Sequence, residues 1–586
     1  MNTCCLIRGL PNTVKRSACR ILWPLSALFL VALSACSSNT TNGPNAANRR
    51  DGLEVTFLVG SAVGEFCQQS MDRFNQTRPK LADGSPFFVT CVAKGSGDIV
   101  SEMLMQADSL KNGSITADDP SWPTLVSLDG DIYLEQLTYQ FQQRFPGQNY
   151  LPGAVDAPLL ANSPMVFMVR SDLAQSLRKT QDPFQAMLTA KSHQDLDPAS
   201  QPLPVRYVHT APTRSNSGLQ TLVAQFASVS GKRPEQLSAA DVQKSQGKVR
   251  EIQQKITRYG ISTNSLAKSM VENGPFWASV GSVYESSVIA ANAHVPAGQP
   301  RYEAVYPNIT YTSNMRGILP TGPWVSGTEK EAAEQVLKYL RTPDAQKIAT
   351  SLGLRPGTPG VALGPKFTSD WGVESSPKYD SYRVPKPEVV GAMLQSWQTA
   401  AKKPSQVAIV VDSSGSMTGS KLAAVQSTLQ TYLKGLGPKE KVALIDFDST
   451  VRNPVVVDGT PKGQSRGLEF VVTLTADGNT KLYDAIRSAQ TWLIKNLQAD
   501  AINAVIVLTD GRDSGSSEQL PQLLEKLKKS GFAGDQRIAI FTVGYGGANE
   551  FSPDVLEQIA EANGGYYRQG DPASIAQLMA DLQVEF

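Results

Sequence analysis

Hydrophobic and polar positions divide most of the chain into two regions of alternating strands and helices. In residues 53–365, apolar runs such as LEVTFLVG (53–60) and FFVTCVAKG (87–95) alternate with segments of helical periodicity such as GDIVSEMLMQADSL (97–110). This alternation predicts an α/β fold with a mostly parallel sheet.

The pattern restarts more sharply after residue 405. The runs VAIVVD, VALIDFD, AVIVLTD and IAIFTVG are almost continuously apolar, as expected for strands of a sheet covered on both faces. Amphipathic segments separate them, and residues 406–586 are therefore predicted to form one doubly wound domain. The proline- and glycine-dotted stretch between the two regions predicts a connector over residues 366–405.

The N-terminus has the pattern of a secretory signal peptide over residues 1–35. Four basic residues precede the apolar run Ile21–Ala35, and no acidic residue occurs before Cys36. The run of about 15 residues is shorter than the roughly 20 needed to span a bilayer, although a membrane-anchoring helix is the alternative. The polar residues 37–52 that follow predict a flexible tether.

The end of the apolar run, Leu33-Ser34-Ala35-Cys36, resembles the lipobox of bacterial lipoproteins. The resemblance implies that Cys36 is lipidated and becomes the first residue of a mature protein held at a membrane surface. Because Ser37 stands where the family's inner-membrane retention signal has Asp, an outer-membrane location is favoured over the plasma membrane. The body would then lie on the periplasmic or extracellular side.

Cysteine usage predicts a disulfide, and the balance of charges bears on whether the protein binds nucleic acid. Once the signal peptide is removed, Cys67 and Cys91 remain besides Cys36. An isolated pair in an exported chain predicts a disulfide, with two buried free thiols as the alternative. The 55 Lys and Arg residues against 53 Asp and Glu residues leave no excess of positive charge for nucleic-acid binding.

Three segments of the second region carry oxygen ligands where a sheet of this kind binds them, at the carboxyl ends of strands. Asp412–Ser416 and Asp510-Gly511 each follow a strand, and Gly478–Thr480 opens a helix. Oxygen ligands without His or Cys suit a hard cation, Mg²⁺ first and then Mn²⁺ or Ca²⁺. The alternative is that these residues only cap helices. Asp446 and Asp448 have no matching role and are interpreted as surface residues at a strand end.

These segments resemble the metal-ion-dependent adhesion site (MIDAS) of von Willebrand factor type A (VWA) domains, whose pattern is Asp-x-Ser-x-Ser, a distant Thr and a further Asp. The resemblance covers residues 406–586. It implies that the cation keeps a position open for an acidic residue of a partner protein, because Mg²⁺ readily retains exchangeable waters. The implied ligands, direct or through water, are Asp412, Ser414, Ser416, Thr480 and Asp510.

Residues 53–365 resemble the type 2 periplasmic solute-binding fold in layout and in phrases such as LEVTFLVGSAVGEF and KYLRTPDAQKIATSLGLRP. The resemblance implies two lobes that close on a ligand, one over 53–162 plus the end of the unit and the other over 166–305. Helix starts would bind anions or polar oxygens, and acidic residues a cation or hydroxyls, unless they are plain caps and turns. The candidate cleft residues are Ser61, Ser96, Asp129, Ser215, Ser217 and Glu285.

The sequence favours binding over catalysis. The three histidines all precede residue 295, and the sequence has no H-E-x-x-H, P-loop or zinc-type cysteine cluster. The working hypothesis is a lipid-anchored envelope protein whose VWA cation docks an acidic residue of a partner protein. The alternatives are a substrate-binding receptor of an ABC-type importer and an accessory subunit of an enzyme assembled through the metal site.

Overall fold

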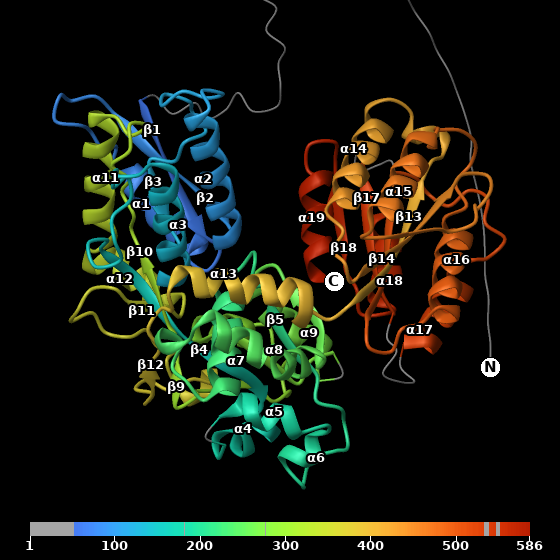
Figure 1. Cartoon of the computed structure of the whole chain (residues 1–586), viewed down its shortest axis with the longest axis horizontal. Helices are drawn as coiled ribbons and strands as arrows, with labels where there is room; N and C mark the ends of the chain where they lie inside the picture. Colours follow the sequence, from blue (N-terminus) through green and yellow to red (C-terminus); the bar gives the residue numbers. More distant parts are fainter. Residues whose placement is uncertain (1–51, 181, 276, 532–537, 547–550) are drawn as a thin grey trace, which may run out of the picture. The chain divides into compact units, whose positions relative to one another are not determined.

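The structure, a computed structural model, describes residues 52–180, 182–275, 277–531, 538–546 and 551–586. The predicted signal peptide, Cys36 and nearly all of the tether lie outside the described residues. Asp51–Phe586 clusters as one compact unit, which contains a two-lobed region followed by a C-terminal α/β domain (Figure 1). Of the helices in the described ranges, none is long and apolar enough to cross a membrane.

The first lobe is a three-stranded parallel sheet in the order β2-β1-β3, with helices on both faces. Alternate residues of β1 face opposite ways: Val55, Phe57 and Val59 pack with α1, α11 and α12, whereas Leu58 packs with α2 and α3. The sheet therefore buries apolar side chains on both faces, as its continuous apolar strands predict. Its elements are β1 (Leu53–Gly60), α1 (Gly64–Gln76), β2 (Phe87–Lys94), α2 (Ser96–Lys111), β3 (Leu125–Ser127), α3 (Asp131–Arg144), α11 (Gly327–Leu340) and α12 (Pro343–Ser351).

The predicted disulfide is present in this lobe. Cys67 of α1 and Cys91 of β2 are bonded, and their Cα atoms lie 6.1 Å apart. The bond joins a helix to the edge strand of the sheet that the helix covers.

The second lobe is built on β4 (Leu159–Arg170), which also links the two lobes. The first half of β4 pairs antiparallel with β10 and β11, and its second half pairs antiparallel with β7 and β8. β5 then lies parallel to both β6 and β7. The remaining elements are α4 (Ser171–Arg178), α5 (Pro183–Thr189), α6 (His193–Leu196), β5 (Tyr207–Thr210), α7 (Asn216–Ser230), α8 (Ala239–Gln253), β6 (Ile256–Gly260), α9 (Thr263–Asn273), β7 (Val280–Tyr284), α10 (Glu285–Asn292), β8 (Tyr302–Val305), β9 (Ile309–Thr310), β10 (Thr312–Arg316) and β11 (Arg355–Pro356).

The stretch predicted as a connector is largely packed against the two-lobed region. Phe367 and Val373 are buried in the core of the second lobe, and the two-residue strand β12 (Asp380–Ser381) pairs with β9. The helix α13 (Pro387–Ser396) contacts α3 of the first lobe and α7 and α8 of the second. Residues 366–401 therefore belong structurally to the two-lobed region.

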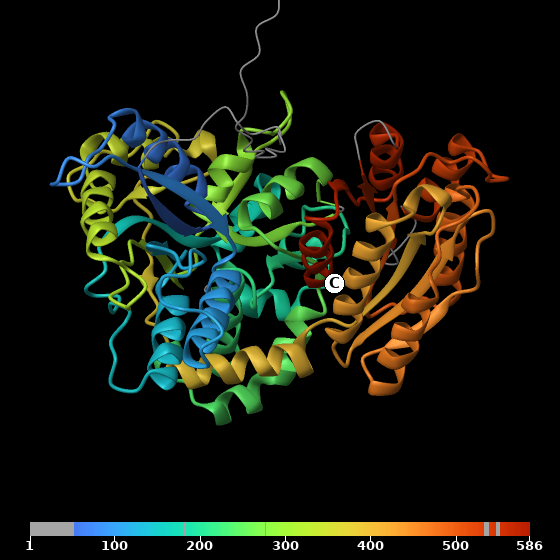
Figure 2. The same cartoon turned by 90° about the horizontal axis from the view of Figure 1, so that it is seen from above.

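The C-terminal domain is a six-stranded sheet in the order β15-β14-β13-β16-β17-β18, parallel except for the edge strand β15. One face is covered by α14, α15 and α19 and the other by α16, α17 and α18, and Figure 2 shows the strands between the two helix layers. The predicted doubly wound fold is confirmed. The elements are β13 (Ser405–Asp412), α14 (Ser420–Lys434), β14 (Glu440–Phe447), β15 (Val455–Asp458), α15 (Pro461–Thr473), α16 (Leu482–Lys495), β16 (Ile502–Thr509), α17 (Leu520–Gly531), β17 (Ile538–Tyr545), α18 (Pro553–Glu561), β18 (Tyr567–Gly570) and α19 (Ile575–Glu585).

Candidate functional site

The three predicted metal-binding segments meet at the carboxyl ends of β13 and β16. These strands are parallel neighbours at the centre of the C-terminal sheet, so the loops that leave them emerge at the same edge. The third segment precedes α16 and is joined to the loop after β16, because the Thr480 amide donates to Ser514 Oγ at 3.1 Å and the Ser514 amide to the Thr480 carbonyl at 2.9 Å.

A chain of short hydrogen bonds connects the two carboxylates. The Ser416 hydroxyl donates to Asp510 Oδ1 at 2.6 Å and lies 3.1 Å from Ser414 Oγ. The Ser414 amide donates to Asp412 Oδ1 at 2.8 Å. Asp412 and Asp510 are 0% and 1% exposed, whereas Ser416 is exposed, so the site lies between a buried floor and the surface.

Thr480, the fifth predicted metal ligand, also lies at this site. A methyl group added at Gly511 would lie 3.1 Å from Thr480 Oγ1 and 3.7 Å from Asp412 Oδ2. The hydroxyl of Thr480 and the carboxylate of Asp412 therefore face the same small space, which the glycine leaves free. All five oxygen-bearing residues that the sequence predicts are brought together.

The electrostatics of the site fit a bound cation. Burial raises the pKa of Asp412 to about 6, and the nearby Asp510 adds to this rise. The ammonium of Lys421 lies 2.7 Å from Asp510 Oδ2. The described residues contain no cluster of three or more His, Cys, Asp and Glu suited to a metal, so any cation here must rely on two carboxylates and three hydroxyls. That oxygen-only set suits Mg²⁺, which keeps several of its waters.

Asp446 and Asp448 support this edge of the sheet, and their interpretation as surface residues is wrong. They are 7% and 8% exposed. Ser413 Oγ donates to Asp446 Oδ2 at 3.2 Å, and the Lys481 amide donates to the Asp448 carbonyl at 3.0 Å. Each aspartate thus holds a residue next to a predicted ligand. The polar alternation of DFD at the end of an apolar strand was the signal available in the sequence.

The candidate cleft residues of the two-lobed region only partly come together. Asp129 is buried where the lobes meet, with its amide donating to Ser96 Oγ at 3.0 Å and its Oδ2 accepting from the Ala62 amide, next to Ser61, at 3.3 Å. From the second lobe, Asn216 Nδ2 donates to the Asp129 carbonyl at 3.0 Å. The sequence did not single out Asn216, although it lies between two predicted cleft residues.

The other candidates are held within the second lobe. Ser217 Oγ lies 2.7 Å from Thr210 Oγ1 and 3.2 Å from Ser215 Oγ, so these serines link α7 to β5. Glu285 is 0% exposed and forms a bidentate ion pair with Arg355 at 2.7 and 2.8 Å. Its carboxylate is thereby satisfied by an arginine, which gives it a structural role.

Fold and sites together define a two-lobed binding protein joined to a domain of the VWA type. Residues 69–375 match the family model described as bacterial extracellular solute-binding protein, and residues 406–581 match the VWA domain model. The chain belongs to the bacterial extracellular solute-binding protein family and carries a C-terminal VWA domain. The predicted resemblances to solute-binding proteins and to VWA domains are confirmed.

Curated relatives match the VWA domain. Inter-alpha-trypsin inhibitor heavy chain H4 is 29% identical over 173 residues in Homo sapiens and 30% identical over 173 residues in Bos taurus. Each match covers 28% of this chain and 18% of the relative. The chain therefore spans less than a fifth of the length of these relatives.

Solved structures resemble each part in turn. The sulfate-binding protein SubI from Mycobacterium tuberculosis H37Rv is 18% identical with a TM-score of 0.37, covering 59% of this chain and 96% of SubI. Maltose-bound MalE3 of T. maritima is 14% identical with a TM-score of 0.39, and the match covers 58% of this chain and 98% of MalE3. A von Willebrand factor type A protein from Catenulispora acidiphila is 22% identical with a TM-score of 0.28, and the match covers 32% of this chain and 43% of that protein.

Proposed function

We propose that this protein is a lipid-anchored envelope protein whose VWA domain binds a divalent cation and uses it to dock an acidic residue of a partner protein. The observation that carries the proposal is the convergence of three hydroxyl side chains, those of Ser414, Ser416 and Thr480, on the two buried carboxylates Asp412 and Asp510. Two buried carboxylates are costly unless positive charge compensates them, and Lys421 supplies one such charge at Asp510. An exported protein also fits a family described as extracellular.

The residues that would hold the cation are Asp412, Ser414, Ser416, Thr480 and Asp510. A bound Mg²⁺ would supply an electrophilic position at which a carboxylate from outside can replace water. The protein contributes two carboxylate charges and three neutral hydroxyls. Because the ammonium of Lys421 also pairs with Asp510, the site with Mg²⁺ bound would keep a net positive charge. Ser413 and Lys481, held by Asp446 and Asp448, keep the flanking loops in place.

Titration with Mn²⁺ by isothermal calorimetry tests the cation site. We expect Asp412→Asn to weaken Mn²⁺ binding by more than about tenfold, because ligand charge sets the affinity of an oxygen-only site. Asp500→Asn, at an exposed position of the same domain, is the matched control and should bind as the wild type does. Equal affinities for Asp412→Asn and the wild type would exclude this site.

Partner docking is tested by affinity capture from envelope extracts in Mg²⁺ and in EDTA. The proposal requires a protein that is retained only with Mg²⁺ and that Asp412→Asn does not retain. Retention independent of the cation would exclude docking through it.

The lipid anchor is tested separately: Cys36→Ser should move the protein from the membrane fraction to the soluble fraction.

A second candidate function is solute capture for an ABC-type importer. The family match over residues 69–375 favours it. So do Oδ1 of Asp129 and Oδ1 of Asn216, which are buried where the lobes meet and have no hydrogen-bond partner among the described residues. Native mass spectrometry of protein purified without added ligand distinguishes the two functions. A retained small-molecule adduct would support capture, whereas a single divalent ion and no adduct would support docking alone.

A further inference from the structure

The second lobe contains a cavity of about 320 Å³ next to the first turns of α7. Asn216, where the lobes meet, begins α7, whereas the cavity is lined by Gln220, Thr221 and Ala224, one and two turns further along. β4 supplies Met165, Val166 and Phe167 on another side. A volume of this size lies within the range of small-molecule sites.

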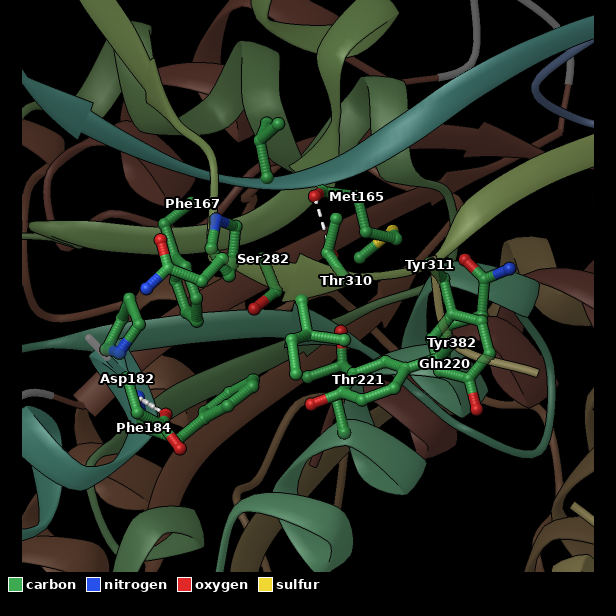
Figure 3. Close-up of a pocket in the computed structure, with 16 residues that line it drawn as sticks. Met165, Phe167, Asp182, Phe184, Gln220, Thr221, Ser282, Thr310, Tyr311 and Tyr382 are labelled. Atoms are coloured by element: carbon green, nitrogen blue, oxygen red, sulfur yellow. Dashed lines mark hydrogen bonds between the residues drawn. The ribbon is translucent and has the colours of Figure 1, made fainter. Parts of the chain in front are cut away.

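Aromatic rings form much of the wall (Figure 3). Phe167 and Phe184 meet edge to face with ring centroids 4.9 Å apart. Tyr311 and Tyr382 form another part of the wall, with ring centroids 5.2 Å apart. Flat apolar walls of this kind favour a ring compound, because aromatic faces and edges pack against another ring.

Three residues that line the cavity carry buried polar atoms for which the described residues offer no partner. Thr221 Oγ1, Tyr311 Oη and Gln220 Oε1 are buried, and the described residues provide no hydrogen-bond partner for them. Buried polar atoms are almost always satisfied in native proteins. Two hydroxyls and one amide oxygen match a ligand group that both donates and accepts, which is the property of a hydroxyl.

The charge of the lining excludes an anion. Asp182 is the one charged residue among the described residues that line the cavity. Its carboxylate accepts from the Phe184 amide at 2.9 Å at the start of α5. A carboxylate or sulfate ligand would find no positive side chain here, so an uncharged ligand is favoured.

Tyr382 comes from outside the family match, which ends at residue 375. Its amide donates to the Thr310 carbonyl at 2.8 Å, which places its ring beside Tyr311 over the cavity. The segment between the two family matches thus supplies part of the cavity wall.

We propose that this cavity is a second ligand site, which binds an uncharged ring compound carrying a hydroxyl group. The site is separate from the proposed cation site. It adjoins the contact between the lobes, because Gln220 Nε2 lies 3.5 Å from Ser313 Oγ, which also accepts from Asn216 Nδ2. The ring packs between Phe184 and Tyr382, and the hydroxyl of the ligand pairs with Thr221, Gln220 and Tyr311. Neither the family match nor the VWA domain requires such a site.

Saturation-transfer NMR and calorimetry on the full-length protein test the site with three probes that share one ring. We expect p-cresol to bind, toluene to bind more weakly and 4-methylbenzoate not to bind. Thr221→Val keeps the shape but removes the hydroxyl, and should weaken p-cresol binding about fivefold while leaving toluene unchanged. Ala224→Leu fills the space and should weaken both by more than about tenfold.

Ala82→Leu, the same change on an exposed loop, is the control and should bind all probes as the wild type does. The proposal is overturned if p-cresol does not bind the wild type, or if 4-methylbenzoate binds as well as p-cresol. It is also overturned if Thr221→Val binds p-cresol with wild-type affinity. That variant decides the outcome even where Ala224→Leu fails to fold.

Discussion

Asp129 shows how a single residue can make stability depend on pH. A methyl group at Gly60 would lie 2.2 Å from its Oδ1, so the glycine allows the buried carboxyl group to sit against the backbone of β1. Burial raises the pKa of Asp129 to about 7, although hydrogen bonds from the Ala62 amide and Ser96 oppose this rise. The protonated form is therefore favoured in the folded protein at mildly acidic pH.

We predict that the two-lobed region loses stability between pH 4 and pH 8 because of this carboxyl group. The folded-state pKa lies above the unfolded value near 3.8, so its stabilising contribution is complete below about pH 4 and is lost as pH rises through 7. Urea unfolding of Asp129→Asn should remove up to about 4 kcal/mol of this pH dependence. Asp156→Asn, at an exposed site, should keep the wild-type profile; parallel profiles for Asp129→Asn and wild type would contradict the prediction.

The buried pair of Glu285 and Arg355 leads to a second prediction at this scale. Tyr306 Oη also donates to Glu285 Oε1 at 2.5 Å, so the carboxylate is fully engaged. Glu285→Gln or Arg355→Met alone should lower the free energy of unfolding by about 3–5 kcal/mol, because each leaves a buried group without its partner. The double variant should lose less than the sum in urea unfolding. Additive losses would show that the two residues act independently.

At the scale of elements, sequence periodicity located most strands and helices but not those defined by distant partners. β1 matches its predicted range, 53–60. The run SPMVFMVR (163–170) predicts only the second part of the crossing strand β4. The strand begins at Leu159 because residues 159–162 are paired by β10 and β11, more than 150 positions later. β15 and β18 are edge strands of four residues each, too short for sequence periodicity to identify them.

The candidate metal site and the cleft show the same difference between local sequence patterns and contacts of distant residues. The candidate metal-binding residues could be predicted because they lie next to apolar strands and helices in a fixed order, which a sequence displays. The cleft depends on which lobe surfaces meet, so the sequence indicates the segment Ser215–Ser217 but not that Asn216 is the residue that reaches the other lobe. Glu285 was assigned to the cleft because the sequence gives no sign that Arg355, 70 residues away, is its partner.

The disulfide supplies a prediction about one pair of elements, α1 and β2. The bond closes a loop of 24 residues, which should stabilise the folded state by roughly 3 kcal/mol in the chain-entropy treatment. Replacing both Cys67 and Cys91 with Ala should lower the free energy of unfolding of the first lobe by that amount, as measured in urea. Adding a reductant to the wild type should have the same effect. Unchanged stability in both cases would contradict the prediction.

For the two-lobed region as a whole, α13 is one of the elements that contact both lobes. Gln136 Nε2 of the first lobe donates to the Pro387 carbonyl at 2.8 Å. Trp397, directly after α13, donates from Nε1 to Gln253 Oε1 of the second lobe at 3.2 Å. Opening the lobes would therefore have to break contacts of α13 as well as those across the cleft.

We predict that Val390→Asp loosens the closed arrangement. Val390 is 0% exposed on α13, so a buried charge there should detach the helix. The Gly97 amide, which donates to the Arg214 carbonyl of the other lobe at 2.9 Å, should then exchange its hydrogen faster. Gln395→Asp, on the exposed side of α13, is the control. Equal exchange at Gly97 in both variants would show that α13 does not restrain the lobes.

The packing of α13 also limits how evolution can exchange the two modules. The family matches end at 375 and resume at 406, but the residues between them supply Tyr382 and α13 to the two-lobed region. A gene fusion that replaced everything after residue 375 would add a new C-terminal domain but would also remove Tyr382 and α13 from the two-lobed region. A recombination point after Ala401 would instead leave the whole two-lobed region intact, because Trp397 and Ala401 are still buried in its core.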